Sequence, residues 1–435
     1  MAPLPPDRVV VINDRSTKVG GATNLAILSA ELLQQRGIPV TFFAGDGAPT
    51  NKPSDDTINL DAVPLMERRR SDALRFGLYD PPVYERLSGL ISSRDTPSTI
   101  YHVHGWSKIL SPAIFRALAP VRDRVVLHAH DYFLACPNGG FVNYQTHRVC
   151  ELKPMSGRCL TTQCDKRGLH EKAWRTARHM LREQLFPTKR MAANIIVVHE
   201  RMRAYFERAG IDGTQIETIR NPVLPFVAPG LQPWTNRNFV FVGRLEPEKG
   251  FEDAAKAAKL AGLPLHFVGD GAGRALIETR FPDATVHGWK TKDEMRDIIR
   301  SARAVVVSSR VPEPFGLAAL EAVSCGIPVI LPDAALLADE IVALGCGLKF
   351  RIADVEHLAA AMRSIAADDA WVHRMSDNCL REAARLAHSP ETWADELIAL
   401  YGRVLQRANR APSDVVPTHM APSGTAYDLQ DGGVR

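Results

Sequence analysis

Two cations stand close together in a segment that follows an apolar run of the chain. Arg244 and Lys249 come after Phe239–Val242, which is predicted to be a buried strand that ends at Gly243. An arginine can place two N–H groups on phosphate oxygens, and a lysine adds a compact positive charge. Such a pair would be ordinary in a surface loop, but open α/β sheets bind ligands at the carboxyl ends of their strands. The pair therefore indicates a site for a diphosphate.

Two glutamates lie in a segment with a helix-start pattern. From Glu313 to Glu321 the chain reads Glu-Pro-Phe-Gly-Leu-Ala-Ala-Leu-Glu. Pro314 is well placed to open a helix, and Gly316 lets the backbone approach a ligand closely. Free N–H groups at a helix start attract anions, and the Glu321 carboxylate can accept hydrogen bonds from ribose hydroxyls. We therefore expect a helix, predicted at Leu317–Ser324, whose amino end near Phe315 faces a nucleotide.

These segments resemble the donor-binding signature of glycosyltransferase family 4, whose members have the GT-B fold. The likeness is strong over residues 239–365 and weaker over the N-terminal half. It implies that Arg244 and Lys249 hold the diphosphate of a nucleotide sugar. It also implies that Glu313 lies beside the donor sugar, that Glu321 binds the ribose, and that backbone groups nearby contact sugar and phosphate. The expected donor-binding residues are Gly21, Arg244, Lys249, Gly269, Trp289, Glu313, Phe315, Gly316, Leu317 and Glu321.

Two members of this set have alternative interpretations. The glycine-rich turn that begins at Gly269 is not a dinucleotide fingerprint, because Arg274 stands where the last glycine should be. The resemblance instead places this turn in the nucleotide site. Trp289 belongs to a segment that lies against the nucleotide base in family members, but the indole could equally be packed in the core.

The N-terminal half carries the candidate acceptor-binding residues. Gly20 and Gly21 lie between the first predicted strand and helix, where backbone without side chains can approach the diphosphate or the acceptor. A simple tight turn is the alternative. His130 and Asp131 follow a later strand, and the resemblance implies that the histidine contacts the acceptor or the transferred sugar. A structural histidine bonded to backbone is the alternative.

The sequence contains no Asp-x-Asp pair, which brings a divalent metal to the nucleotide sugar in the other main transferase fold. Arg244, Lys249 and the helix start near Phe315 can offset the charge of a departing diphosphate instead. We therefore expect metal-independent catalysis without a required cofactor, and the resemblance implies retention of anomeric configuration. The predicted catalytic residues are His130, Glu313, Arg244 and Lys249. His104 and His128 are predicted to be structural.

Four cysteines bunch together in the N-terminal half, at Cys136, Cys150, Cys159 and Cys164. A structural zinc bound by four thiolates is one hypothesis, but the intervals lack the close Cys-x-x-Cys pairs that make a zinc motif specific. The other three of the seven cysteines are isolated and are predicted to be packing residues. The odd total argues against a disulfide scaffold.

Strands and helices must alternate in both halves to position these residues. Strand-sized apolar runs such as Val9–Ile12 and Leu265–Val268 recur between stretches of helical periodicity, which predicts parallel sheets. Residues 46–98 are less regular and contain many polar and proline breaks. The expected fold is α/β of the GT-B class, with two doubly wound Rossmann-like domains facing each other across a cleft.

The predicted organisation has four parts: an N-terminal acceptor-binding domain (1–222) with a Cys-bearing insertion at about 136–190, a C-terminal nucleotide-sugar domain (223–390), a helix that packs back on the N-terminal domain (391–410), and a disordered tail (411–435).

Composition excludes several classes of protein. The 435 residues carry a formal charge of only +4, which is far from the footprint of a nucleic-acid binder. No apolar run is long enough to cross a bilayer, and the first residues lack the apolar core of a secretory signal. We therefore expect a cytoplasmic protein. Basic clusters at Arg68–Arg70 and 166–190 allow peripheral contact with an anionic membrane.

The function expected from the resemblance is transfer of a sugar from a UDP- or GDP-sugar to a lipid-linked or saccharide acceptor, in polysaccharide or cell-envelope glycan synthesis. Other GT-B chemistry, such as sugar-nucleotide epimerisation, is one alternative. A non-catalytic sugar-nucleotide-binding protein is another, although such a protein would be expected to lose Lys249 or Glu313, and both are present.

Overall fold

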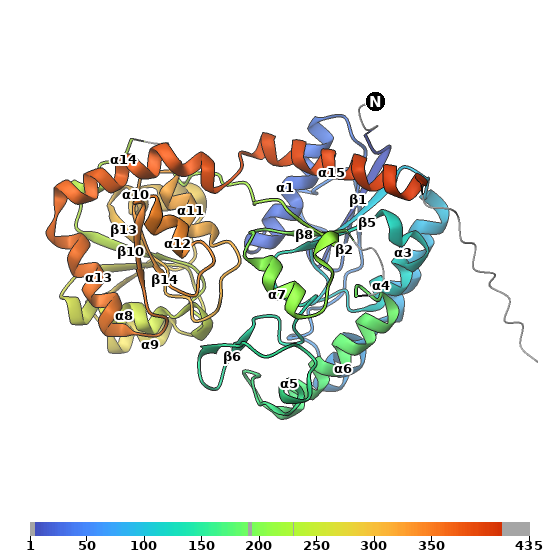
Figure 1. The fold of residues 1–435 in the computed structure, drawn as a ribbon, viewed down its shortest axis with the longest axis horizontal. Helices are drawn as coiled ribbons and strands as arrows, with labels where there is room; N and C mark the ends of the chain where they lie inside the picture. The colour runs from blue at the N-terminus through green and yellow to red at the C-terminus, as the bar shows by residue number, and fades with distance from the viewer. Residues whose placement is uncertain (1–4, 190–193, 229, 411–435) are drawn as a thin grey trace, which may run out of the picture.

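The computed structural model describes residues 5–189, 194–228 and 230–410. Two α/β domains, each built on a parallel sheet, lie side by side in Figure 1. The N-terminal sheet contains β1 (Arg8–Asn13), β2 (Val40–Ala44), β3 (Asp56–Asn59), β4 (Thr99–Val103), β5 (Val125–Ala129), β8 (Asn194–Val197) and β9 (Ile216–Thr218). The C-terminal sheet contains β10 (Asn238–Val242), β11 (Leu265–Val268), β12 (Thr285–Val286), β13 (Ala302–Val306), β14 (Val329–Pro332) and β15 (Gly347–Phe350).

Strand order brings the candidate loops to one edge of each sheet. The orders are β3-β2-β1-β4-β5-β8-β9 and β12-β11-β10-β13-β14-β15. All pairs in both sheets are parallel; Val9, for example, lies opposite both Val40 and Ile100. The carboxyl ends of parallel strands meet at the same edge, so the loops after β1, β4 and β5 lie together, as do those after β10, β11 and β13.

Helices connect and cover the strands. Those of the N-terminal half are α1 (Gly21–Gln35), α2 (Arg70–Leu78), α3 (Pro81–Arg94), α4 (Ala113–Leu118), α5 (Gly157–Thr161), α6 (Leu169–Leu185) and α7 (Met202–Arg208). Those of the C-terminal half are α8 (Phe251–Ala261), α9 (Arg274–Arg280), α10 (Lys292–Arg300), α11 (Leu317–Val323), α12 (Ala338–Ala343), α13 (Val355–Ala367), α14 (Asp369–Leu386) and α15 (Pro390–Arg410). The short strands β6 (Val142–Asn143) and β7 (Arg148–Val149) pair within the Cys-bearing insertion.

The predicted fold class, two parallel α/β domains, is confirmed, and several strands match their predicted bounds, such as Leu265–Val268. Residues 46–98, which showed a less regular pattern, nevertheless contain β3, α2 and α3. The reason is visible in β3, which lies at the edge of its sheet with all four residues only partly buried. A strand of that kind carries no continuous apolar run.

The helix predicted at Leu317–Ser324 is confirmed, because α11 spans Leu317–Val323. Pro314, however, does not open this helix as its position suggested. Gly316 has a left-handed conformation with φ 68° and ψ 55°, which interrupts the helical path. Pro314 and Phe315 therefore belong to the loop that precedes α11.

The last helix, α15, crosses from the C-terminal domain and lies along the N-terminal domain, as Figure 1 shows. Trp393, Leu397 and Tyr401 are fully buried there in one apolar cluster with Val9 and Val11 of β1. Residues 391–410, predicted as a helix that packs back on this domain, lie within α15. The predicted disordered tail, 411–435, lies outside the described residues.

Within the described parts of the chain, none of the helices combines the length and the apolar character that a bilayer span requires.

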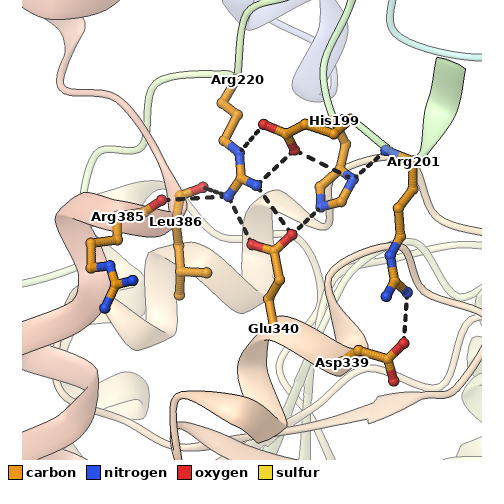
Figure 2. Close-up of polar contacts among 8 residues, drawn as sticks. His199, Arg201, Arg220, Asp339, Glu340, Arg385 and Leu386 are labelled. Atoms are coloured by element: carbon orange, nitrogen blue, oxygen red, sulfur yellow. Dashed lines mark hydrogen bonds and ion pairs between the residues drawn. The ribbon is translucent and has the colours of Figure 1, made fainter.

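A polar interdomain cluster joins the domains near the exit of β8, and we define it as His199, Glu200, Arg220 and Glu340 (Figure 2). Arg220 Nη2 lies 2.7 Å from Glu200 Oε2, and Arg220 Nη1 lies 3.0 Å from Glu340 Oε2. His199, whose side chain is fully buried, has its Nε2 3.0 Å from Glu340 Oε1. Glu340 is on α12 of the C-terminal domain, whereas the other three residues precede that domain. The cluster therefore constrains how the domains lie relative to each other.

Replacing Arg220 tests this constraint. In Arg220→Leu the neighbouring carboxylates of Glu200 and Glu340 lose their shared countercharge and repel each other. We expect a stability loss of about 1–3 kcal/mol and a wider range of domain orientations, measured by small-angle scattering. The control is Arg296→Leu, because Arg296 makes an exposed ion pair with Asp293 inside α10. A scattering profile identical to that of the parent protein would contradict the role of the cluster.

Candidate functional site

An ion pair at the strand ends of the C-terminal sheet lies at the centre of the site. Lys249 ends a 3-10 turn, η4 (Pro247–Lys249), after β10, and Glu313 lies in the loop between β13 and α11. Lys249 Nζ donates to Glu313 Oε1 at 2.6 Å, and the Ser309 hydroxyl donates to Oε2. Burial by itself raises the pKa of Glu313, but the charge of Lys249 and these hydrogen bonds hold it below its ordinary value. Glu313 is therefore a carboxylate at neutral pH.

A glycine lets the two loops meet. Gly250 has φ +67°, and a Cβ atom there would lie 1.8 Å from the carbonyl oxygen of Ser308. The Ser308 hydroxyl donates to the Gly250 carbonyl at 2.8 Å. Any larger residue would push η4 away from the end of β13, so this close backbone approach brings Lys249 to Glu313.

A second ion pair joins the loop between β13 and α11 to helix α8. Arg310 binds Asp253 with two hydrogen bonds, from Nε at 2.6 Å and from Nη2 at 2.5 Å. Asp253 is buried on α8, and its hydrogen bonds to Arg310 raise the pKa of the guanidinium. Arg310 is thus committed to a protein carboxylate, and it holds the loop that carries Glu313 against α8.

Arg244 is placed differently from Lys249. Its side chain is 67% exposed, and its nearest acid is Glu248, with Nη2 3.7 Å from Oε1. Glu248 also pairs with Lys166 of the Cys-bearing insertion at 2.6 Å. The charge of Arg244 nonetheless contributes to the lowered pKa of Glu313. An exposed, weakly held guanidinium near the ion pair has room to turn towards a bound anion.

The N-terminal domain meets this loop through Tyr132. Its buried hydroxyl donates to the carbonyl oxygen of Pro312 at 3.2 Å, one residue before Glu313. His130 and Asp131 directly precede Tyr132, so the structure brings these predicted acceptor residues towards the predicted donor residues. Asp131 is exposed as a residue, but desolvation of its carboxyl group by the surrounding protein raises its pKa to about 6.

A second contact across the domains involves Gly21, the first residue of α1. A Cβ atom at Gly21 would lie 2.8 Å from Leu317 Cδ1, at the start of α11. Gly20 precedes α1 with φ 81°. The predicted glycine pair and the predicted helix start are therefore neighbours, and the bare backbone at Gly21 is what allows the close approach.

The remaining predicted donor residues lie at or near the same edge of the sheet, and Trp289 is exposed there. Gly269 has φ +139°, and its Cβ position lies 1.9 Å from the carbonyl oxygen of Gly243, so the loops after β10 and β11 also touch. Phe315 is buried, and Glu321 is half-buried on α11. Trp289 is 70% exposed, so its alternative placement in the core is wrong.

His130 is neutral and paired with another histidine. Its Nε2 lies 2.9 Å from His104 Nδ1, and burial lowers its pKa to about 3. His104 and His128, predicted to be structural, are both buried. The side chain of His130 is half-buried at the carboxyl end of β5.

The four clustered cysteines do not form a compact group of three or more thiols. Among the described residues, the groups of three or more side chains close enough to share a metal include none of Cys136, Cys150, Cys159 and Cys164. Lys172 lies among them, with its Nζ 3.4 Å from Cys164 Sγ. The zinc hypothesis stays a prediction. The isolated cysteines at 325, 346 and 379 are buried, as predicted.

Several residues of the site were missed from the sequence. Ser309 contacts Glu313, whereas Tyr132 and Lys166 contact Pro312 and Glu248, which directly precede Glu313 and Lys249. A lone serine, tyrosine or lysine has no distinguishing motif. The only available signal was proximity, because Ser309 lies four residues before Glu313 and Tyr132 directly follows Asp131.

Comparison with known proteins identifies the family. Residues 19–224 match the family model described as Glycosyltransferase Family 4, and residues 230–383 match that described as Glycosyl transferases group 1. The chain belongs to glycosyltransferase family 4. It is a glycosyltransferase, and the GT-B arrangement predicted for it is confirmed.

Named relatives and solved structures are similar to this glycosyltransferase over different lengths. The glycogen synthase of Mycobacterium tuberculosis is 33% identical over 181 residues, which are 37% of this chain and 42% of the relative, so the match spans about two fifths of that protein. A GDP-mannose-dependent alpha-mannosyltransferase of Mycolicibacterium smegmatis is 27% identical over 89% of this chain and 95% of its own.

Two solved structures share the fold along nearly the whole chain. Sucrose-phosphate synthase from Thermosynechococcus elongatus has a TM-score of 0.69 at 21% identity, over 92% of this chain and 99% of its own. Anabaena HepE in complex with UDP-glucose has a TM-score of 0.59 at 18% identity, over 90% and 98%.

Lys249→Ala tests the central ion pair. Loss of the ammonium removes the countercharge of Glu313, whose pKa must then rise, and removes a cation predicted to face the diphosphate. We expect sugar transfer to fall at least about 100-fold while the far-UV circular dichroism stays unchanged. The matched control is Lys256→Ala, because Lys256 pairs with Glu252 on the outer part of α8. Equal activity in the two variants would contradict a role for Lys249.

Proposed function

We propose that the enzyme transfers a sugar from a nucleoside-diphosphate sugar to a saccharide or lipid-linked acceptor, with retention of configuration, in polysaccharide or cell-envelope glycan synthesis. The observation that carries the proposal is the ion pair of Lys249 and Glu313 at the carboxyl ends of β10 and β13, with the exposed Arg244 beside it. Cations and a carboxylate at this edge suit a ligand with an anionic part and a hydroxyl-rich part.

In this proposal the leaving diphosphate is bound by protein groups. Lys249 and Arg244 supply positive charge where negative charge grows as the glycosidic bond breaks, and this preorganised charge lowers the barrier. The amide groups of Leu317 and Ala318 at the start of α11 can add hydrogen bonds, whereas those of Ala319 and Leu320 donate to the Gly316 carbonyl. Glu313, held as a carboxylate, accepts hydrogen bonds from hydroxyls of the donor sugar. No divalent ion is required in this scheme.

The donor is proposed as a UDP- or GDP-hexose. The Mycolicibacterium relative is named for GDP-mannose, and the Anabaena structure contains UDP-glucose. The exposed indole of Trp289 is available to stack on a base, and stacking accepts either nucleobase. Gly20, His130 and Asp131 of the N-terminal domain are proposed to bind the acceptor opposite the donor.

A thermal-shift panel of UDP, GDP and their hexose derivatives tests the donor. A ligand at 100 times its dissociation constant stabilises the native state by about 2.7 kcal/mol, so the correct nucleotide should raise the unfolding temperature clearly. The titrations are run in EDTA, because the proposal needs no divalent ion. Lys249→Ala should lose the shift, whereas Lys256→Ala should keep it. Stabilisation that appears only with Mg²⁺ would contradict the metal-free scheme, and none with any nucleotide would contradict the donor class.

We further propose that the Cys-bearing insertion rests on an anionic membrane. An apolar groove of about 430 Å³ lies between α5 and α6. Its rim includes Leu169 and Met180, which are 60% and 57% exposed. Arg158 is exposed on α5, and Arg70 reaches α6 to lie 3.6 Å from Glu171. Exposed apolar side chains among cations fit the interface of an anionic bilayer, where a lipid-linked acceptor would be found.

Vesicle co-sedimentation tests this contact. The protein should bind phosphatidylglycerol-containing vesicles, more weakly at high salt, and bind phosphatidylcholine vesicles poorly. Leu169→Glu/Met180→Glu should lose most of the binding, because the introduced carboxylates oppose both burial and anionic lipid. The control is Leu260→Glu, at a 54% exposed leucine of the C-terminal domain. Equal binding by both variants would contradict this surface.

A further inference from the structure

Four histidines form two neighbouring pairs, or layers, beside the candidate site. In one layer His102 Nε2 lies 3.2 Å from His128 Nδ1, and in the other His104 Nδ1 lies 2.9 Å from His130 Nε2. The ring centroids of His102 and His104 are 4.0 Å apart with the ring planes tilted by 41°, and those of His128 and His130 are 4.1 Å apart and stacked. Each layer is thus an edge-to-edge imidazole pair at the carboxyl ends of β4 and β5.

This geometry favours a hydrogen-bonded relay over a metal site. His102, His104 and His128 are close enough to one another to be candidate ligands. An imidazole nitrogen, however, binds a metal along its lone pair, in the plane of the ring. Here the nitrogens that join each pair face each other at hydrogen-bond distance, not the other pair. Both nitrogens of His102 and both of His104 already have hydrogen-bond partners.

The direction of the hydrogen bond between His104 and His130 follows from Ser29. Ser29 Oγ donates its only proton to the carbonyl of Ala26 at 2.7 Å, so towards His104 it can only accept. A hydrogen bond across the 3.4 Å between Ser29 Oγ and His104 Nε2 therefore needs a hydrogen on Nε2. Burial and neighbouring imidazoles hold the pKa of His104 well below its ordinary value, so the ring is neutral and its Nδ1 is bare. A bare Nδ1 requires that His130 Nε2 be the donor.

We propose that Ser29 and His104 are positioning residues that fix the tautomer of His130, so that its unprotonated Nδ1 accepts a hydrogen bond from a sugar hydroxyl in the cleft. Nδ1 of His130 has no hydrogen-bond partner among the described residues. It is not one of the buried side-chain atoms without a hydrogen-bond partner either, so it is accessible to solvent. The alternative tautomer would present an N–H donor instead. The inference rests on the proposed function for the identity of the hydroxyl, but the tautomer does not depend on it.

Imidazole ¹⁵N spectra of the histidine-labelled full-length protein test the tautomer without any substrate. His130 signals are assigned by their loss in His130→Asn. The expected spectrum has a protonated Nε2 and an unprotonated Nδ1. In Ser29→Ala the acceptor of His104 is lost, so both His130 nitrogens should shift towards averaged values, and kcat should fall about three- to tenfold with the donor KM within about twofold. His104→Leu should remove the preference entirely.

The matched control is Ser376→Ala, because Ser376 is a buried helical serine whose hydroxyl has no hydrogen-bond partner. It should leave both the His130 spectrum and kcat unchanged. A protonated Nδ1 in the parent protein, or a His130 spectrum unaffected by Ser29→Ala, would overturn the relay. If the expected tautomer is present but no nucleotide sugar supports transfer, the proposed function is wrong and the relay stands.

Discussion

The ion pair between Lys249 and Glu313 joins the loops that follow β10 and β13. A carboxylate in such a poorly solvated position is stable only with a countercharge, and the ammonium supplies it at 2.6 Å. The backbone contact at Gly250 and the pair between Arg310 and Asp253 hold the two loops so that this distance is possible. A phosphate that binds Lys249 must share the ammonium with Glu313, so ligand binding acts directly on the interaction that organises the site.

The site depends on both domains. Tyr132 contacts the C-terminal domain at Pro312, and Gly21 contacts it at Leu317. These two contacts flank the short segment that contains Glu313. The interdomain cluster around Arg220 and the passage of α15 onto the N-terminal domain limit the relative position of the two halves (Figures 1 and 2). Because surfaces between domains of one chain usually permit motion, such contacts restrict how the two domains lie relative to each other.

The two sides of the site differ in charge. The C-terminal side carries Lys249 and Arg244, which suit an anion. The N-terminal side carries His130, which is neutral because burial lowers its pKa to about 3, and Asp131, whose pKa is raised to about 6. A neutral imidazole and a weakly basic carboxylate suit hydroxyl groups. This asymmetry fits a donor bound through its diphosphate and an acceptor bound through its hydroxyls.

The sequence by itself determined the fold class and the strand ends on which the candidate residues lie, because alternating buried strands and amphipathic helices leave a periodic pattern. It also singled out Lys249 and Glu313 through their motifs. Only the tertiary structure decided that these two side chains pair, that Gly316 keeps Pro314 and Phe315 out of α11, and that Ser29 and His104 act on His130. Such contacts join residues far apart in the chain, and their geometry depends on backbone conformations and approach distances that a linear pattern does not encode.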